Sequence, residues 1–345
     1  MSDIIFSTQS DSKKNQLALI TLNRPAALNA LNGDMFLRMQ EQLQHWQCND
    51  AIKAVVIRST LEKAFCAGGD VRAVYENHRT RASVSMQYFE LEYAIDRLIT
   101  HYPKPIVPML QGITMGGGVG ISVHASHCVA SENLRWAMPE TLIGFFPDVG
   151  ASYYLSRLSG GVGIYLALTG ASINTTDALN LCLIKSVVPY HQFDALTDKL
   201  AETIYDSRDF AAISRIIAEF SVRSPLPALL PPVENISECF LFDTIEHIMN
   251  RLKAVNTPWS NEVITQLQQR SPTSLKVTLQ QLQRAKNMKV DDVFDMDLHI
   301  AHRMLEHNDF YEGVRAAIVD KDKKPRWEPN ELSKVASTNV DSFFI

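Results

Sequence analysis

The sequence predicts an α/β fold with an additional helical C-terminal region. Over the first 205 residues, short apolar runs typical of buried strands alternate with segments whose apolar residues recur at helical spacing. Beyond residue 206, helical patterns follow one another. Because strands that alternate with helices form a mixed core, we expect a core over residues 1–205 and a mainly helical region over residues 206–345.

The elements of the core can be placed in order along the chain. A cap at Asn32 or Asp34 predicts the start of a first helix. Apolar spacing predicts a longer helix over residues 83–100, which the prolines of "YPKP" end. Residues 121–126 are expected to be helical, after a run of glycines. Strands are expected at residues 17–22, 54–59, 106–110, 128–131 and 134–138.

The C-terminal region contains an internal boundary. Proline-rich residues 224–235 mark a boundary or linker between two helical parts. Helical patterns are expected at residues 209–220, 238–255, 260–270, 274–285 and 292–307.

Charge, hydropathy and cysteine usage exclude several classes of protein. The 345 residues carry 33 basic and 38 acidic side chains, a net charge of −5, which gives no nucleic-acid footprint. No apolar run reaches the ~18 residues that a membrane span needs. The N-terminal residues show no signal or transit pattern, so a cytoplasmic location is the expectation. Five scattered cysteines without a CxxC pair argue against disulfides and a zinc site.

A run of three glycines, Gly116–Gly118, followed by Gly120, is the first candidate site. Such a bare backbone suits a phosphate cradle, an oxyanion hole or a close-packed turn. The dinucleotide motif GxGxxG lacks its third glycine here, no GxxxxGK[ST] motif occurs, and GxSxG fails at His124. An oxyanion hole or plain packing remains. The pair Gly68 and Gly69, after an expected strand, leaves the same two interpretations open.

Two carboxylates lie in a strongly apolar stretch and form the second candidate site. Glu140 and Asp148 are surrounded in sequence by Met, Leu, Ile and Phe residues. Each is either an ordinary acid at a helix start or turn, or a buried group with a raised pKa. Their proximity in sequence, downstream of the glycine run, favours a site.

Three motifs together give the chain a specific resemblance. "AFCAGGD" (64–70), "QGITMGGGVG" (111–120) and "AMPETLIGFFPDVG" (137–150) resemble, in order and spacing, the crotonase (enoyl-CoA hydratase/isomerase) superfamily. The resemblance implies a spiral of ββα units that binds acyl-CoA over residues 1–205, with residues 206–345 completing or covering the site. It also implies that the backbone N–H groups of Gly69 and Gly117 form an oxyanion hole for the thioester oxygen.

Departures from the hydratase pattern indicate a branch of this family. Hydratases carry a glutamate where this chain has Gly120, and commonly a glycine where it has Asp148. With these changes the chain resembles the 3-hydroxyisobutyryl-CoA hydrolases of valine breakdown. The resemblance implies that Glu140 acts as a nucleophile through a mixed anhydride or as a base to water. Asp148 would hold the substrate's 3-hydroxyl or position the water, and Glu92 would orient the acyl end.

The resemblance also sets expectations for ligands and partners. Glu92, Gly117, Glu140 and Asp148 are expected to bind the acyl-CoA substrate, which is 3-hydroxyisobutyryl-CoA or also 3-hydroxypropionyl-CoA. No metal or redox cofactor is implied, since coenzyme A arrives as part of the substrate. Relatives of this fold often form trimers, and the sequence leaves a homo-oligomer open. The alternatives are an enoyl-CoA hydratase or isomerase of fatty-acid oxidation and a non-catalytic subunit.

For three further side chains near the motifs, a structural role is the stronger interpretation. Cys66, beside the first glycine pair, is either a packed small side chain or a reactive thiol. His124 and His127 follow the glycine run, and a structural role is expected for both.

Overall fold

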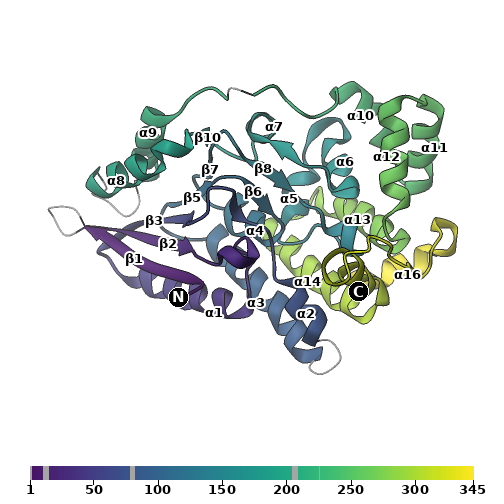
Figure 1. Ribbon diagram of the computed structural model, residues 1–345, viewed down its shortest axis with the longest axis horizontal. Helices are drawn as coiled ribbons and strands as arrows, with labels where there is room; N and C mark the ends of the chain where they lie inside the picture. Colours follow the sequence, from purple (N-terminus) through teal and green to yellow (C-terminus); the bar gives the residue numbers. More distant parts are fainter. Residues whose placement is uncertain (1, 11–14, 78–81, 204–208, 225) are drawn as a thin grey trace. The chain divides into compact units, whose positions relative to one another are not determined.

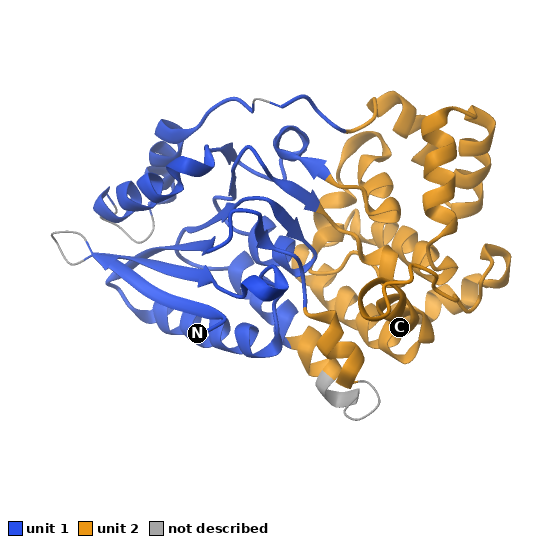
Figure 2. Ribbon diagram, in the orientation of Figure 1, with its two compact units in different colours: residues 1–69, 91–136, 173–229 blue, residues 70–90, 137–172, 230–345 orange. Residues whose placement is uncertain are grey.

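The computed structural model describes residues 2–10, 15–77, 82–203, 209–224 and 226–345 (Figure 1). It divides into two compact units, each built from segments that are distant in sequence (Figure 2). Unit 1 comprises Met1–Gly69, Leu91–Trp136 and Ile173–Leu229, and unit 2 comprises Asp70–Glu90, Ala137–Ser172 and Leu230–Ile345. The expected α/β class, with helices dominating the C-terminal part, is confirmed.

The units cut the chain at places other than the expected domain boundary. That boundary, between residues 205 and 206, lies outside the described residues. Residues 137–172, assigned to the core by sequence, group with the C-terminal helices in unit 2. The chain leaves unit 1 for the last time after Leu229, which lies inside the proline-rich stretch 224–235.

A six-stranded sheet forms the centre of unit 1 among the described residues. Its strands, in spatial order, are β1 (Ile4–Ser10), β2 (Gln16–Leu22), β3 (Ile52–Ser59), β5 (Ile106–Leu110), β7 (Val129–Ala130) and β10 (Ser186–Val187). The β1–β2 pair is antiparallel and the other pairs are parallel. Strand β1 was not expected, because only Ile4 of its seven residues is buried and its pattern is mostly polar.

Both faces of this sheet are covered, which explains its continuous apolar runs. Leu17 and Leu19 of β2 pack with α8 (Phe193–Thr203) and α9 (Phe210–Phe220), while Ala18 and Ile20, which point the other way, are also buried. Figure 1 shows α1 (Gly33–Cys48) on the side of these strands away from α8 and α9.

Helix α1 begins where the sequence predicted a cap. The Asn32 side chain accepts a hydrogen bond of 2.9 Å from the Met35 N–H, so Asn32 and not Asp34 is the cap. The apolar residues at helical spacing are all buried: Phe36, Met39, Leu43 and Trp46.

A second, smaller sheet carries the strands that lead into the glycine motifs. Its order is β4 (Ala64–Cys66), β6 (Ile113–Met115), β8 (Arg135–Ala137) and β9 (Ile173–Asn174). Strands β4 and β6 run parallel, so the loops after them leave the same edge. The remaining helices that begin in unit 1 are α4 (Gly117–Val123) and α7 (Thr175–Asn180), and α3 (Ala82–Thr100) enters unit 1 at Leu91.

Among the described residues of unit 2, the regular secondary structure is helical apart from the end of β8. Its helices are α2 (Val71–Asn77), α5 (Ala151–Leu155), α6 (Val162–Thr169), α10 (Val233–Phe240), α11 (Ile245–Val255), α12 (Pro258–Gln268), α13 (Pro272–Ala285), α14 (Val290–Glu306), α15 (Asn308–Val314) and α16 (Ser337–Asp341). Short 3₁₀ segments include η1 (Pro25–Ala27) and η4 (Tyr190–Gln192) in unit 1, and η2 (Glu140–Ile143), η3 (Ser159–Gly161), η6 (Leu332–Lys334) and η7 (Ser342–Phe344) in unit 2. A π-helical turn, η5 (Arg315–Val319), follows α15.

The helical pattern at residues 238–255 is not one helix. Helix α10 ends at Phe240, and α11 starts after Thr244, whose hydroxyl accepts the His247 N–H at 3.2 Å. The threonine cap supplies a new helix start that apolar spacing alone did not separate from the preceding one.

Candidate active site

The first glycine loop is held in unit 1 by backbone hydrogen bonds. Strand β4 ends at Cys66, and Gly68 then adopts a φ of +115°, which side-chain-bearing residues rarely adopt. The Gly68 carbonyl accepts the Leu31 N–H at 2.9 Å, and Ala67 donates to the Leu28 carbonyl at 3.0 Å. These bonds fix the position of Gly69 at the end of the loop.

The second glycine run is the start of helix α4. Gly116 precedes the helix with φ +47° and ψ −121°, and Gly117 is its first residue. A β-carbon on Gly117 would overlap Glu92 Oε1 and would lie 3.4 Å from the Gly69 nitrogen. Unit 1 therefore brings together three residues that the sequence assigned to one site: Gly69, Gly117 and Glu92.

The next glycine of the run has a packing role. A β-carbon on Gly118 would lie 2.7 Å from the Cβ of Cys66. Burial, aided by the charge of Glu92, raises the pKa of the Cys66 thiol to about 12. The thiol is thus neutral and packed, and the interpretation of Cys66 as a reactive cysteine is wrong.

Glu92 and His127 are both buried in unit 1. Glu92 is 3% exposed, so it is a buried acid on α3. His127 is held between Ser126 Oγ at 2.8 Å and the Phe210 carbonyl at 3.0 Å, and burial lowers its pKa. This confirms a structural role for His127.

Unit 2 contains the two candidate carboxylates. Glu140 is the first residue of η2, as a first-turn acid would be, and its carbonyl accepts the Phe145 N–H at 3.1 Å. The segment is followed by Gly144, whose φ is +69°. A β-carbon at Gly144 would approach the Asp309 carbonyl to 2.5 Å, so the close packing of α15 requires a glycine at this position.

Asp148 is carried by a short loop ahead of α5. Its carbonyl accepts the Ala151 N–H at 2.9 Å, and the cap position of α5 belongs to Gly150. Asp148 is therefore not the helix cap that one interpretation of the sequence gave. Asp148 is 5% exposed, so it lies inside unit 2 rather than at a surface turn.

The two carboxylates interact electrostatically. Burial first, and the charge of Asp148 second, raise the pKa of Glu140 well above its ordinary value. Glu140 Oε2 is buried without a hydrogen-bond partner in the described part of the chain. A carboxyl group with a raised pKa holds its proton more strongly than an ordinary glutamate, which is a property of many acid–base groups in active sites.

Sequence reasoning missed two polar side chains that hold the Asp148 loop. Asp297 of α14 accepts the Gly150 N–H, and Gln281 of α13 donates to the Pro147 carbonyl. A signal was present, because Asp297 interrupts the apolar stripe of its helix, as does Gln281. A polar residue in such a stripe is buried by its neighbours and needs a partner.

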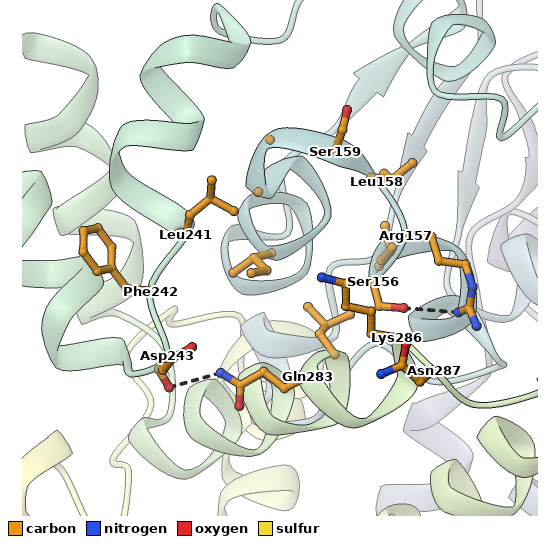
Figure 3. Close-up of a pocket in the computed structure, with 15 residues that line it drawn as sticks. Ser156, Arg157, Leu158, Ser159, Leu241, Phe242, Asp243, Gln283, Lys286 and Asn287 are labelled. Atoms are coloured by element: carbon orange, nitrogen blue, oxygen red, sulfur yellow. Dashed lines mark hydrogen bonds between the residues drawn. The ribbon is translucent and has the colours of Figure 1, made fainter.

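The cavity in Figure 3 is not the predicted site. It has a volume of about 550 Å³ in unit 2 and lies between the Leu155–Gly161 segment, the α10–α11 turn and the end of α13. Neither Glu140 nor Asp148 lines it. Its Arg157 already donates to the Ala285 carbonyl at 3.1 Å and the Met288 carbonyl at 2.7 Å.

The family model described as enoyl-CoA hydratase/isomerase matches residues 17–344. The chain belongs to the enoyl-CoA hydratase/isomerase family. Among curated members, the chain is 38% identical to the mitochondrial 3-hydroxyisobutyryl-CoA hydrolase of Gallus gallus, over 96% of this chain and 87% of that protein. It is 37% identical to the Danio rerio protein of the same name, over 99% and 89%. It is 34% identical to the Homo sapiens protein, over 96% and 87%.

Solved structures of the family confirm the crotonase fold. A carnitinyl-CoA dehydratase from Mycobacterium thermoresistibile is 32% identical with a TM-score of 0.89, over 100% of this chain and 97% of that one. An enoyl-CoA hydratase from Rhodobacter sphaeroides is 32% identical with a TM-score of 0.86, over 99% and 97%. These structures carry hydratase or dehydratase names, whereas the curated relatives are named hydrolases.

The expected cytoplasmic location is wrong by this comparison. The curated relatives are named mitochondrial, and they match over almost the whole chain. The prediction rested on a missing leader pattern, and a missing pattern carries no positive information about location. Within the described residues, the structure has no helix with the length and apolarity of a membrane span.

Proposed function

We propose that this protein is a thioester hydrolase that cleaves 3-hydroxyisobutyryl-CoA with water into 3-hydroxyisobutyrate and free coenzyme A. The observation that carries the proposal is the buried pair of Glu140 and Asp148, in which the second charge raises the pKa of the first. Relatives named 3-hydroxyisobutyryl-CoA hydrolase, 34–38% identical over most of the chain, support it. With this substrate the enzyme would serve valine breakdown.

In this proposal the glycine loops stabilise negative charge. The N–H groups of Gly69 and Gly117 form the oxyanion hole for the thioester oxygen. Two observations support this role. The two residues lie close together in unit 1, and Gly117 is the first residue of a helix, where backbone N–H groups have no hydrogen-bond partner within the helix. Removing one such donor costs about 3 kcal/mol of transition-state stabilisation in known cases.

The carboxylates perform the bond changes. As a nucleophile, the Glu140 carboxylate attacks the thioester carbon, expels the coenzyme A thiolate and leaves an anhydride that water hydrolyses. As a base, Glu140 takes a proton from the attacking water, and the proton later passes to the thiolate. The raised pKa of Glu140 suits the second role, because it makes the carboxylate a stronger base than an ordinary glutamate.

Asp148 and Glu92 bind the acyl part of the substrate. Asp148 accepts a hydrogen bond from the 3-hydroxyl, and Glu92 orients the acyl end. A buried group that expects a hydroxyl partner rejects a substrate without one, because it would be left unpaired. A preference for 3-hydroxyacyl thioesters over plain acyl thioesters follows, and 3-hydroxypropionyl-CoA falls in the same substrate class.

Release of free coenzyme A tests the proposal directly. The purified protein is incubated with 3-hydroxyisobutyryl-CoA and, separately, with crotonyl-CoA, and the thiol is trapped with a colorimetric reagent. We expect release from the hydroxyacyl thioester alone, lost in Glu140→Gln and Asp148→Asn. Glu219→Gln and Asp292→Asn change exposed acids and serve as matched controls. Release that survives in both site variants would refute the assignment.

A hydratase is the second candidate, because both solved structures at 32% identity carry hydratase or dehydratase names. The same incubations distinguish it. Hydration of crotonyl-CoA, seen as loss of enoyl absorbance without thiol release, would favour the hydratase over the hydrolase.

A further inference from the structure

The loop that carries Asp148 has an unusual backbone. Val149 has a φ of +53° and Gly150 a φ of +71°, so two consecutive residues are left-handed. For a β-branched residue such as Val149 this conformation is rare and unfavourable. It persists only where surrounding groups hold the backbone in place. Val149 is fully buried, so those groups belong to the interior of unit 2.

Asp297 holds the C-terminal side of the loop. Its Oδ2 accepts the Gly150 N–H at 2.9 Å, and the residue is fully buried on α14. Gly150 is two residues from Asp148 and opens helix α5. This bond therefore fixes the backbone directly after Asp148.

Gln281 holds the N-terminal side of the same loop. Its Nε2 donates to the Pro147 carbonyl at 2.9 Å and to Asp297 Oδ1 at 2.7 Å. Gln281 is fully buried on α13. The two side chains are joined to each other, and together they grip the backbone on both sides of Asp148.

Helix α13 adds a third contact along the same face. The Ser274 hydroxyl, seven residues before Gln281, donates to the Phe145 carbonyl. Residues seven apart lie on one face of a helix. Successive positions of α13 thus hold the carbonyls of Phe145 and Pro147, between Glu140 and Asp148.

Packing alone gives no reason for a carboxylate at this place. Burial raises the pKa of Asp297 well above its ordinary value, and the nearby charge of Asp148 adds to that shift. An apolar side chain of similar volume avoids this desolvation penalty and is often as stable or more stable. The hydrogen bonds from Gly150 and Gln281 lower the pKa of Asp297 and so favour its charged form.

We propose that Asp297 and Gln281 are positioning residues that hold Asp148 where it can accept the 3-hydroxyl of the substrate. The inference rests on the proposed function, since it assigns Asp148 the task of recognising the hydroxyl. It adds that this recognition depends on two side chains on α13 and α14 that touch the loop and not the substrate. Disturbing either one shifts the Asp148 carboxylate while leaving Asp148 itself in the chain.

The effect to measure is the preference for a hydroxylated substrate. The ratio of kcat/KM for 3-hydroxyisobutyryl-CoA to kcat/KM for isobutyryl-CoA reports how well the hydroxyl is bound in the transition state. A variant that merely contains less folded enzyme loses both activities by the same factor, and its ratio stays at the wild-type value. A displaced Asp148 lowers the ratio.

Asp297→Asn and Gln281→Met are the test variants, because each keeps the side chain's size and removes hydrogen bonds. We expect the ratio to fall about tenfold in each, mainly through the hydroxylated substrate. The double variant should fall little further than the single ones, because both residues act on one loop. Asp292→Asn on α14 and Gln283→Met on α13 change exposed residues of the same helices and should keep the wild-type ratio.

Hydrogen exchange of the segment 145–155 provides the second measurement, which needs no activity. We expect faster exchange confined to this segment in the test variants, whereas general destabilisation speeds exchange throughout unit 2. An unchanged ratio, or equal loss on both substrates, overturns the positioning role. Failure of the proposed function is a separate result, because the wild-type protein itself would then release no thiol from 3-hydroxyisobutyryl-CoA.

Discussion

The candidate residues of unit 1 and those of unit 2 are different kinds of chemical group. Unit 1 presents backbone at Gly69 and Gly117, and a side chain on Gly117 would collide with Glu92. Unit 2 presents side chains, Glu140 and Asp148, and burial together with the charge of Asp148 raises the pKa of Glu140. The first glycine loop is held by the backbone of Leu28 and Leu31, whereas the Asp148 loop is held by side chains of helices more than a hundred residues away.

The largest expected effect lies in unit 2. Glu140→Gln removes the group proposed to attack or to accept the proton, and we expect kcat for thiol release to fall about 10³-fold. Steady-state kinetics with 3-hydroxyisobutyryl-CoA measure it, with Glu219→Gln as the control. A fall of less than tenfold would show that Glu140 is neither the nucleophile nor the base.

The matching change in unit 1 should have a smaller effect. In Gly117→Ala the new methyl group overlaps Glu92 Oε1 and crowds the Gly69 nitrogen, and we expect kcat/KM to fall about 10²-fold. Gly33→Ala is the control, because a β-carbon there meets no atom within 4 Å. Equal kinetics of the two alanine variants would show that the Gly117 position plays no part in the reaction.

The pH dependence examines the carboxylate pair itself. If Glu140 acts as a carboxylate, kcat/KM falls as the pH drops through its raised pKa, so the acidic limb lies above the ordinary glutamate range. Asp148→Asn removes a charge that raises this pKa, so the limb of its residual activity should move to lower pH. A pH–rate profile of both proteins checks the direction. An acidic limb at the same pH in both would contradict the electrostatic effect of Asp148 on Glu140.

Stability should change in the opposite sense to activity. Above the ordinary glutamate pKa, the folded chain retains a proton on Glu140 that the unfolded chain releases, so the free energy of unfolding falls as the pH rises through this window. Glu140→Gln has no ionisable group at this position and therefore avoids this decrease in the free energy of unfolding. We expect its Tm to exceed the wild-type value by about 2 °C at pH 8 and by less at pH 5. Thermal melts at several pH values test this, and a Tm gap that narrows as the pH rises is the contrary result.

The smallest effect concerns the thiols. The pKa of Cys66 is about 12, and that of Cys128 is about 12, both because of burial. An alkylating reagent at pH 8 should modify the exposed Cys48 and Cys182 and leave the activity unchanged. Mass spectrometry locates the labels. Rapid labelling of Cys66 would contradict the packing described for the first glycine loop.

Helices and strands could be predicted from the sequence where their buried residues recur at a regular spacing. The strand at Ile106–Leu110 was predicted with its observed bounds, and α1 with its cap and its apolar face. Strand β1 escaped, because its hydrogen bonds to β2 hold it in the sheet although most of its residues are exposed. The break between α10 and α11 escaped because a threonine cap, not a change in apolar spacing, creates it.

The sequence by itself determined the candidate residues of the site. Acids within an apolar stretch marked Glu140 and Asp148 as candidates, whereas Glu92 and the roles of Gly69 and Gly117 were implied by the family resemblance. The tertiary structure decided how these groups are held and how acidic they are. Asp297 and Gln281 reach the Asp148 loop from helices far along the chain, and desolvation sets the pKa of Glu140. Both depend on three-dimensional neighbours, which no local pattern of residues encodes.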